Sequence, residues 1–343
     1  MTSIPGDCCS TGAVTGRISG LTVTLANPKS NSPNKLGTEI KAALFNTQNS
    51  KFRLCGFDVS QEELVIIAVY NSAEFCRFEN IAPDALATEA GKFVLLGSSK
   101  DGTDAHTLLA KRFSISRADS KTLGLSLAYG SGQVSCCNLL RPTLGSKYNE
   151  KELKELVSEY IRYFKGTKAR GDYLYQNGLF SHFFNYAQYL IAQPVPRLQF
   201  GGQAITNTLR PQNCGSDYFT SRINWGVQAT GSYILDYLGY YIDKGIFDAG
   251  LEDFMYFSHS VHDELQYVVH ESAIKAWSDI AKAAYRRVWT EFFASFRMAC
   301  PQEVFDNLEL VSDSAYRKSP NTDLCTASGK YFFYDLKPGL VIN

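Results

Sequence analysis

The stretch FSHSVHDELQYVV, residues 257–269, places His262, Asp263 and Glu264 in the middle of an apolar, β-prone run. Apolar and aromatic side chains flank this charged group on both sides, which is typical of two short strands joined by a turn. The stretch therefore predicts a β-hairpin whose tip is His262–Asp263–Glu264. Charged hairpin tips are often simply solvated, so other parts of the chain must decide whether this one has a function.

Another candidate carboxylate, Asp58, follows a second predicted strand. The run KFRLCGFDVSQEELVIIAVYN (51–71) predicts a strand at 52–57 and then a helix. Ser60 is the predicted N-cap of that helix, with Glu63 as its capping-box partner. We expect strands of one sheet to present Asp58 and Asp263 together. Two such carboxylates form an oxygen platform for Mg²⁺, and two ions about 3.5–4 Å apart can promote phosphoryl transfer.

A predicted helix at 117–129, RADSKTLGLSLAY, has an informative spacing. Arg117, Lys121, Leu125 and Tyr129 recur every four residues, so they share one helix face. An arginine and a lysine one turn apart are suited to hold a triphosphate. The alternative is an ordinary surface stripe that ends in a packed tyrosine. Together with the two carboxylates, this face has the parts of a nucleotidyl transferase.

Composition sets limits on function. The 343 residues include 45% apolar side chains, and 34 basic and 34 acidic residues cancel, so the chain has no global basic field for nucleic acid. Charge is sorted locally, because residues 92–121 are basic and residues 252–271 are acidic. Nine cysteines without a C-x-x-C pattern favour a reducing compartment over a disulfide framework. No apolar run is long enough for a membrane span, and no signal peptide or presequence is recognisable.

Other patterns are interpreted as structural. Apolar side chains at helical spacing predict core helices at 149–165 and 271–299, and the Pro/Gly-rich stretch 192–203 is the best candidate linker. YGSGQ (129–133) follows a helix and predicts a turn. The histidines near the hairpin do not have the spacing of a zinc site, and no G-x-S-x-G supports a serine nucleophile.

Three motifs resemble those of family A DNA polymerases, in the same order. DVSQEEL (58–64) resembles motif A, RADSKTLGLSLAYG (117–130) resembles motif B, and VHDE (261–264) resembles motif C. Further segments resemble the mitochondrial replicases of that family, the gamma polymerases. These segments are GTDAH (102–106), GTKA (166–169), TSRINWGVQAT (220–230) and VSDSAYRK (311–318). The resemblance runs from about TGR (15–17) to about residue 329.

The resemblance implies an α+β fold, in which a right-hand palm with an antiparallel sheet is interrupted in sequence by helical fingers. We expect the first part of the palm at 1–75, the fingers at 76–215 and the second part of the palm at 216–343. The family's thumb and exonuclease are expected to be absent from this chain. It would then be a fragment of a longer polymerase or one half of a split one, without proofreading and with weak DNA binding.

The implied activity is template-directed DNA synthesis with two Mg²⁺ ions. Asp58 and Asp263 would bind the metal together with the Val59 carbonyl, while Glu264 and His262 would complete the catalytic group. The residues implied to contact the incoming dNTP are His106, Arg117, Lys121, Leu125, Tyr129 and Glu63. Among these, Glu63 would be the steric gate against a ribose 2′-hydroxyl, and Tyr129 would stack near the nascent base pair. The residues implied to contact primer–template DNA are Arg17, Asn224, Gln228 and His262.

Several alternatives remain open. Motif B usually has Phe or Tyr where this chain has Leu125, which puts ring contacts with the incoming sugar in doubt. A single-subunit RNA polymerase is disfavoured by Glu63 and Glu264, and a catalytically silent DNA-binding subunit by the intact carboxylates and cations. A bacterial or phage-type repair polymerase is the nearest alternative to a mitochondrial enzyme. Expected partners are primer–template DNA, dNTPs, and an accessory processivity subunit or a separate thumb and exonuclease chain, with no membrane.

Overall fold

The chain folds into two units. The first, here named the sheet unit, contains residues 1–60, 232–289 and 305–343, and the second, the helical unit, contains residues 61–231 and 290–304. The computed structural model describes residues 8–9, 19–20, 51–59, 61–98, 101–168, 174–215, 219–261, 264–306 and 309–312. The units change at 60/61, 231/232, 289/290 and 304/305, whereas the divisions predicted from the sequence fall at 75/76 and 215/216.

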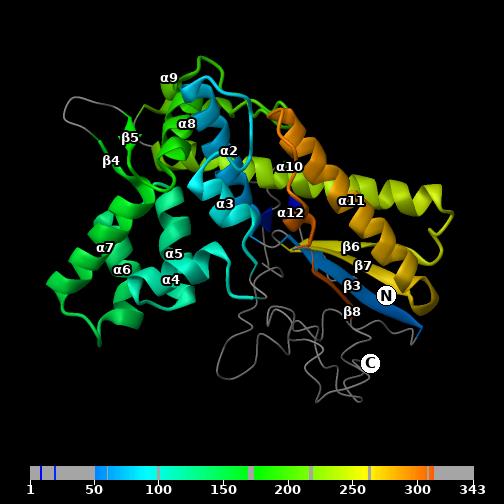
Figure 1. The fold of residues 1–343 in the computed structure, drawn as a ribbon. Helices are drawn as coiled ribbons and strands as arrows, with labels where there is room; N and C mark the ends of the chain where they lie inside the picture. The colour runs from blue at the N-terminus through cyan, green and yellow to red at the C-terminus, as the bar shows by residue number, and fades with distance from the viewer. Residues whose placement is uncertain are drawn as a thin grey trace. The chain divides into compact units, whose positions relative to one another are not determined.

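A four-stranded antiparallel sheet forms the centre of the sheet unit (Figure 1). Its strand order is β6 (Met255–Val261), β7 (Glu264–His270), β3 (Phe52–Asp58) and β8 (Glu309–Ser312). The predicted hairpin is confirmed, because β6 pairs with β7 and only residues 262–263 separate them. Its tip is shorter than predicted, since Glu264 is the first residue of β7. A separate two-stranded ladder joins β1 (Cys8–Cys9) to β2 (Ser19–Gly20).

Aromatic packing fixes helices against this sheet. The buried Tyr267 ring of β7 lies 6.2 Å from the ring of Trp277 in α11 (Ile274–Ser295), which follows the short helix η2 (Glu271–Ala273). The Tyr267 hydroxyl donates to Oδ1 of Asp243 in α10 (Phe219–Asp248) at 3.0 Å. Where α10 approaches α11, a Cβ on Gly245 would come within 2.7 Å of Ile280 Cγ2. Glycine therefore permits the close packing of these two helices.

The helical unit is built from short helices. In chain order its elements are α2 (Glu62–Glu79), α3 (Glu89–Leu95), α4 (Ala105–Phe113), α5 (Arg117–Ala128), α6 (Gln133–Leu144), α7 (Glu150–Lys165), β4 (Thr167–Lys168), β5 (Tyr175–Gln176), α8 (Ser181–Ala192), η1 (Asn207–Leu209) and α9 (Pro211–Cys214). Helices α10, α11 and α12 (Gln302–Asp306) contribute residues to both units.

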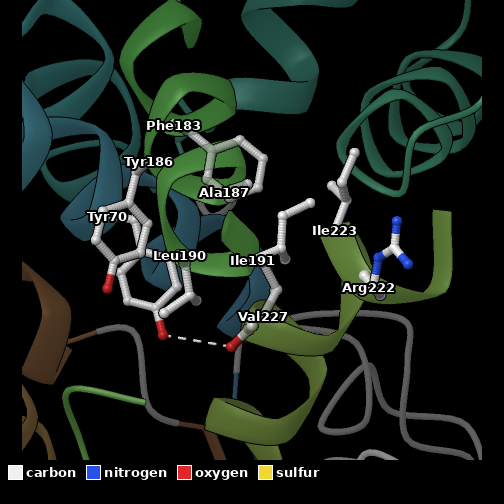
Figure 2. A pocket seen from close by; sticks show the side chains of 10 residues that line it. Tyr70, Phe183, Tyr186, Ala187, Leu190, Ile191, Arg222, Ile223 and Val227 are labelled. Carbon is white, nitrogen blue, oxygen red and sulfur yellow. Dashed lines mark hydrogen bonds between the residues drawn. The ribbon is translucent and has the colours of Figure 1, made fainter. Parts of the chain in front are cut away.

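Helix α2 is the core of the helical unit and packs against α3 and α8 (Figure 1). Tyr70 of α2 is 1% exposed, and its hydroxyl bonds Thr230 Oγ1 at 2.6 Å and donates to the Gly226 carbonyl at 3.3 Å. Figure 2 shows the Tyr70 ring among apolar side chains of α8 and α10. Burial raises the pKa of Tyr70 well above its ordinary value, so this hydroxyl stays protonated.

The predicted start of α2 is wrong. Gln61, with φ 57°, takes the N-cap position and makes no side-chain cap hydrogen bond, while Ser60 lies outside the described residues. The Ser60 partner of the predicted capping box thus falls outside the described residues, and the Glu63 carboxylate accepts a hydrogen bond from Tyr129.

Other sequence expectations had mixed outcomes. The helices predicted at 117–129, 149–165 and 271–299 are confirmed as α5, α7 and η2–α11, with Asn149 and Glu152 forming a capping box before α7. The linker predicted at 192–203 is wrong, because it lies inside the helical unit with Leu198 and Phe200 buried. The α+β class with an antiparallel sheet interrupted by helices is confirmed. Within the described ranges, no helix is long and apolar enough to cross a membrane.

Candidate active site

One end of the sheet carries a row of acidic residues. Strand β3 ends at Asp58, and the register places Asp58 opposite Glu264 of β7 on one side and Glu309 of β8 on the other. Motif A and motif C, about 200 residues apart, therefore meet at the same end of the sheet, since Asp58 is paired with the residue that follows Asp263. Val59 comes directly after β3 and is 1% exposed.

Part of this predicted site cannot be placed. Arg17, His262 and Asp263 lie outside the described residues. Asp58 and Glu264 are placed here by backbone register alone. Among side chains that the structure does describe, no group of three or more His, Cys, Asp or Glu residues is arranged to hold a metal ion. The metal-binding role of the sheet-end acids therefore stays a prediction.

The outer face of α5 has the composition that the sequence predicts. Ser116 caps the helix by accepting from the Asp119 N–H, so α5 begins at Arg117. Arg117 and Lys121 are exposed, whereas Leu125 and Tyr129 are half-buried. On the opposite side of the helix, Leu123, Gly124 and Leu127 are buried, with Gly124 against the rings of Tyr160 and Phe164. The structure thus confirms that the two cations share one accessible face.

A buried carboxylate holds Arg117. The Asp104 side chain is 0% exposed and caps α4, accepting from the N–H and hydroxyl of Thr107. Arg117 donates to it through Nη2 at 2.9 Å and through Nε at 3.2 Å to each oxygen. Burial alone would raise the pKa of Asp104, but the hydrogen bonds from Arg117 and Thr107 outweigh it and lower the pKa, so this carboxylate is ionised at neutral pH.

Helix α4 also carries His106, in its first turn and 3% exposed. The salt bridge between Asp104 and Arg117 therefore brings the first turns of α4 and α5 together. Backbone N–H groups at helix N-termini favour anions. His106, Arg117 and the N-terminus of α5 consequently belong to one region of the helical unit, while their contact with a triphosphate stays a prediction.

The hydroxyl of Tyr129 donates to Oε1 of Glu63 at 2.6 Å. This bond connects the end of motif B to the first turn of α2, so the expected steric gate, Glu63, is joined to the residue expected to stack near the nascent base pair. The neighbouring Glu62 is buried, and a Cβ on Gly231 of α10 would come within 2.7 Å of its Oε2. Space beside the first turn of α2 is therefore restricted.

Asn224 and Gln228 lie one turn apart on the first half of α10, in the helical unit, and both are half-buried. The buried Oδ1 of Asn224 has no hydrogen-bond partner within the described part of the chain. The predicted contact of Asn224 and Gln228 with DNA stays a prediction.

Sequence reasoning missed three features of these regions. Glu309 gave no signal, because a four-residue strand in the tail has no recognisable pattern. The role of Asp104 as a cap was detectable, since Thr107 follows three residues later, but its pairing with Arg117 was not. The bond between Tyr129 and Glu63 joins residues 66 positions apart and left no trace in the sequence.

Comparison with known proteins first defines the class. The POL domain of Pol1 from M. smegmatis, solved in a complex with DNA primer-template and dNTP, superimposes with a TM-score of 0.57 at 16% identity, covering 90% of this chain and 47% of that one. The chain therefore has the fold of a polymerase domain. No protein-family model matches it.

Curated relatives then identify the particular branch. DNA polymerase gamma of Schizosaccharomyces pombe is 29% identical over 93% of this chain and 31% of the relative, and that of Saccharomyces cerevisiae is 28% identical over 93% and 25%. The protein named DNA polymerase gamma, mitochondrial, of Neurospora crassa is 30% identical over 73% of the chain and 16% of the relative. The chain is thus related to DNA polymerase gamma over most of its length, as the motifs predict. It spans less than a third of the length of these relatives.

Proposed function

We propose that this chain is the palm-and-fingers part of a mitochondrial DNA polymerase, which adds dNMP from a dNTP to a primer 3′-hydroxyl on a DNA template. The observation that carries the proposal is the register between Asp58 and Glu264, which unites motifs A and C at one sheet end. The names of the related gamma polymerases support both the activity and the mitochondrial location.

The sheet unit would supply the metal-binding carboxylates. Asp58 and Asp263 would hold two Mg²⁺ ions with the help of the Val59 carbonyl, and Glu264 would shape this end of the sheet. The donor set fits, because carboxylate and carbonyl oxygens are the ligands that Mg²⁺ prefers. When bound, such ions stabilise the charge on the attacking and leaving oxygens of phosphoryl transfer.

The helical unit would bind the incoming nucleotide. Exposed Arg117 and Lys121, one turn apart on α5, would contact the triphosphate with His106. The Glu63 carboxylate, fixed by the Tyr129 hydroxyl, would exclude a ribose 2′-hydroxyl, and Leu125 would line the sugar side of the same helix face. Arg17, Asn224, Gln228 and His262 would contact the primer–template.

The domain assignment follows from these roles. We propose that the sheet unit corresponds to the palm and the helical unit to the fingers, and that an accessory processivity subunit or a thumb-bearing chain is a partner. Under this assignment, the proposed metal-binding residues belong to the palm and the proposed dNTP-binding residues belong to the fingers.

Primer extension tests the proposal. The purified chain is incubated with labelled primer–template, Mg²⁺ and either dNTPs or rNTPs, beside Asp58→Asn and Asp263→Asn variants. We expect extension with dNTPs that both variants abolish. Binding of dATP and of primer–template is measured in parallel by fluorescence anisotropy. A folded chain that neither extends the primer nor binds dATP would contradict the proposal and favour a silent structural subunit.

A further inference from the structure

Asp104 occupies an unusual position for a helix cap. Its side chain is 0% exposed, and its oxygens accept from the Thr107 N–H, the Thr107 hydroxyl, and Nε and Nη2 of Arg117. A capping interaction needs one carboxylate oxygen and no cation. The remaining hydrogen bonds of the carboxylate are therefore made to Arg117, which is 13 residues away and on a different helix.

The geometry leaves one side of the guanidinium accessible. Arg117 uses its Nε and Nη2 nitrogens on Asp104, and no partner of its Nη1 is found among the described residues. The Arg117 side chain is 42% exposed despite this anchoring. The guanidinium of arginine is planar and its N–H donors have fixed directions. Hydrogen bonds from Nε and Nη2 to Asp104 therefore determine where the Nη1 edge points.

We infer that Asp104 is a positioning residue, which holds the Arg117 guanidinium in the orientation that binds the triphosphate of an incoming dNTP. This inference rests on the proposed function. An unanchored arginine loses rotamer freedom when it binds a ligand, whereas an anchored one has lost it on folding. Asp104 neutralises part of the arginine charge, but preorganisation of the fork offsets that loss.

The same chain offers a matched control. Asp119 is also buried in the first turn of α5, at 7% exposure, and its described partners are the hydroxyls of Ser116 and Thr143. Asp104→Asn keeps a good capping side chain but removes the charge and the bidentate acceptor. Asp119→Asn changes a comparable carboxylate that does not contact Arg117 in any described hydrogen bond.

The experiment measures Arg117 itself as well as binding. Full-length chains carrying Asp104→Asn, Asp119→Asn, Arg117→Ala, or Asp104→Asn with Arg117→Ala are compared with the unchanged chain. Mass spectrometry measures the rate at which phenylglyoxal modifies Arg117. Titrations measure the affinities for dATP and for inorganic triphosphate, and thermal melts show whether each variant is folded. For Asp104→Asn we expect several-fold faster modification and about tenfold weaker triphosphate binding, the size of coupling usual between hydrogen-bonded residues.

Each outcome has a defined meaning. Asp119→Asn should leave both properties unchanged, and Asp104→Asn should have no further effect on binding once Arg117 is alanine. If Asp104→Asn binds triphosphate like Asp119→Asn while Arg117→Ala is weakened, Asp104 is only a cap and the inference is overturned. If the unchanged chain and Arg117→Ala bind triphosphate equally, Arg117 does not hold the triphosphate and the inference is overturned, whereas the proposed function is decided separately by primer extension and dATP binding.

Discussion

The sheet end and the outer face of α5 hold their candidate residues in different ways. At the sheet end, Asp58 is placed by the backbone ladders of β3 with β7 and β8, which do not depend on the side chains that carry the chemistry. On α5, Arg117 is placed by one side chain, Asp104, from another helix. Substitutions at the sheet end should therefore change chemistry without changing structure, whereas substitution of Arg117 should change both.

The largest effect is expected where the backbone alone sets the geometry. Asp58→Asn should lower the primer-extension rate about 1000-fold or more if Asp58 binds Mg²⁺ as proposed, because a metal ligand is worth several kcal/mol of charge stabilisation. Rapid-quench primer extension measures the rate, and thermal melts should show an unchanged melting temperature.

Glu309→Gln sharpens this first comparison, since Glu309 occupies the same row on the other side of Asp58. A rate loss as large as that of Asp58→Asn would make the row a three-carboxylate site. A small change would restrict the chemistry to motifs A and C.

Arg117→Ala should reduce both dNTP affinity and stability. Loss of charge-assisted hydrogen bonds to phosphate should weaken dATP binding about 30-fold. The substitution leaves the Asp104 carboxylate buried without its cation, which lowers the free energy of unfolding. Because Arg117 is partly exposed, we expect this loss to be only about 1–2 kcal/mol. Urea denaturation and dATP titration measure the two effects, with Lys121→Ala as the control expected to lose affinity alone.

The salt bridge between Asp104 and Arg117 also predicts a pH dependence. The folded-state pKa of Asp104 lies below the ordinary value of 3.8, so the stabilisation is fully present above that value and is lost as the pH falls through the lowered pKa. Arg117→Ala should reduce this acid-side loss of stability. Circular dichroism measures the acid denaturation midpoints of the unchanged chain and of Arg117→Ala, and identical midpoints would contradict this pH dependence.

Tyr129→Phe tests the sugar side of α5. Without the hydroxyl, the Glu63 carboxylate loses a 2.6 Å hydrogen bond and should swing away, so discrimination against rNTPs should fall about 5–10-fold, as for the loss of one bond of this kind. Competing incorporation of dATP and ATP measures the ratio. Undiminished discrimination would show that Glu63 keeps its position by other contacts.

The smallest effect is expected for Tyr70→Phe, which removes a hydroxyl bonded to Thr230 and Gly226 in the core of the helical unit. We expect a loss of about 1 kcal/mol in unfolding free energy and no change in nucleotide selection. It is thus the matched control for Tyr129→Phe. A change in rNTP discrimination here would mean that selection responds to general stability and not to the bond between Tyr129 and Glu63.

Local patterns were predictable, and long-range pairings were not. The hairpin and α5 follow from spacing within short windows, namely apolar runs around His262–Asp263 and repeats every four residues from Arg117. Register against β8 depends on tertiary packing, so Glu309 was not found. The stretch 192–203 was misinterpreted because Gly and Pro indicate turns whether or not the surrounding apolar residues, here Leu198 and Phe200, are buried.

The bond between Tyr129 and Glu63 has a consequence for how such sequences diverge. Tyr129 and Glu63 are 66 residues apart and joined by one hydrogen bond, so under the proposed function a change at either position should alter which sugars are accepted. If Glu63 is the steric gate as proposed, a related sequence with phenylalanine at 129 should retain an intact DVSQEEL and still discriminate less against ribonucleotides. We therefore expect sugar selectivity to depend on residues 129 and 63 together. A related sequence with weaker selectivity would then differ first at position 129 on α5, outside the DVSQEEL motif that contains Glu63.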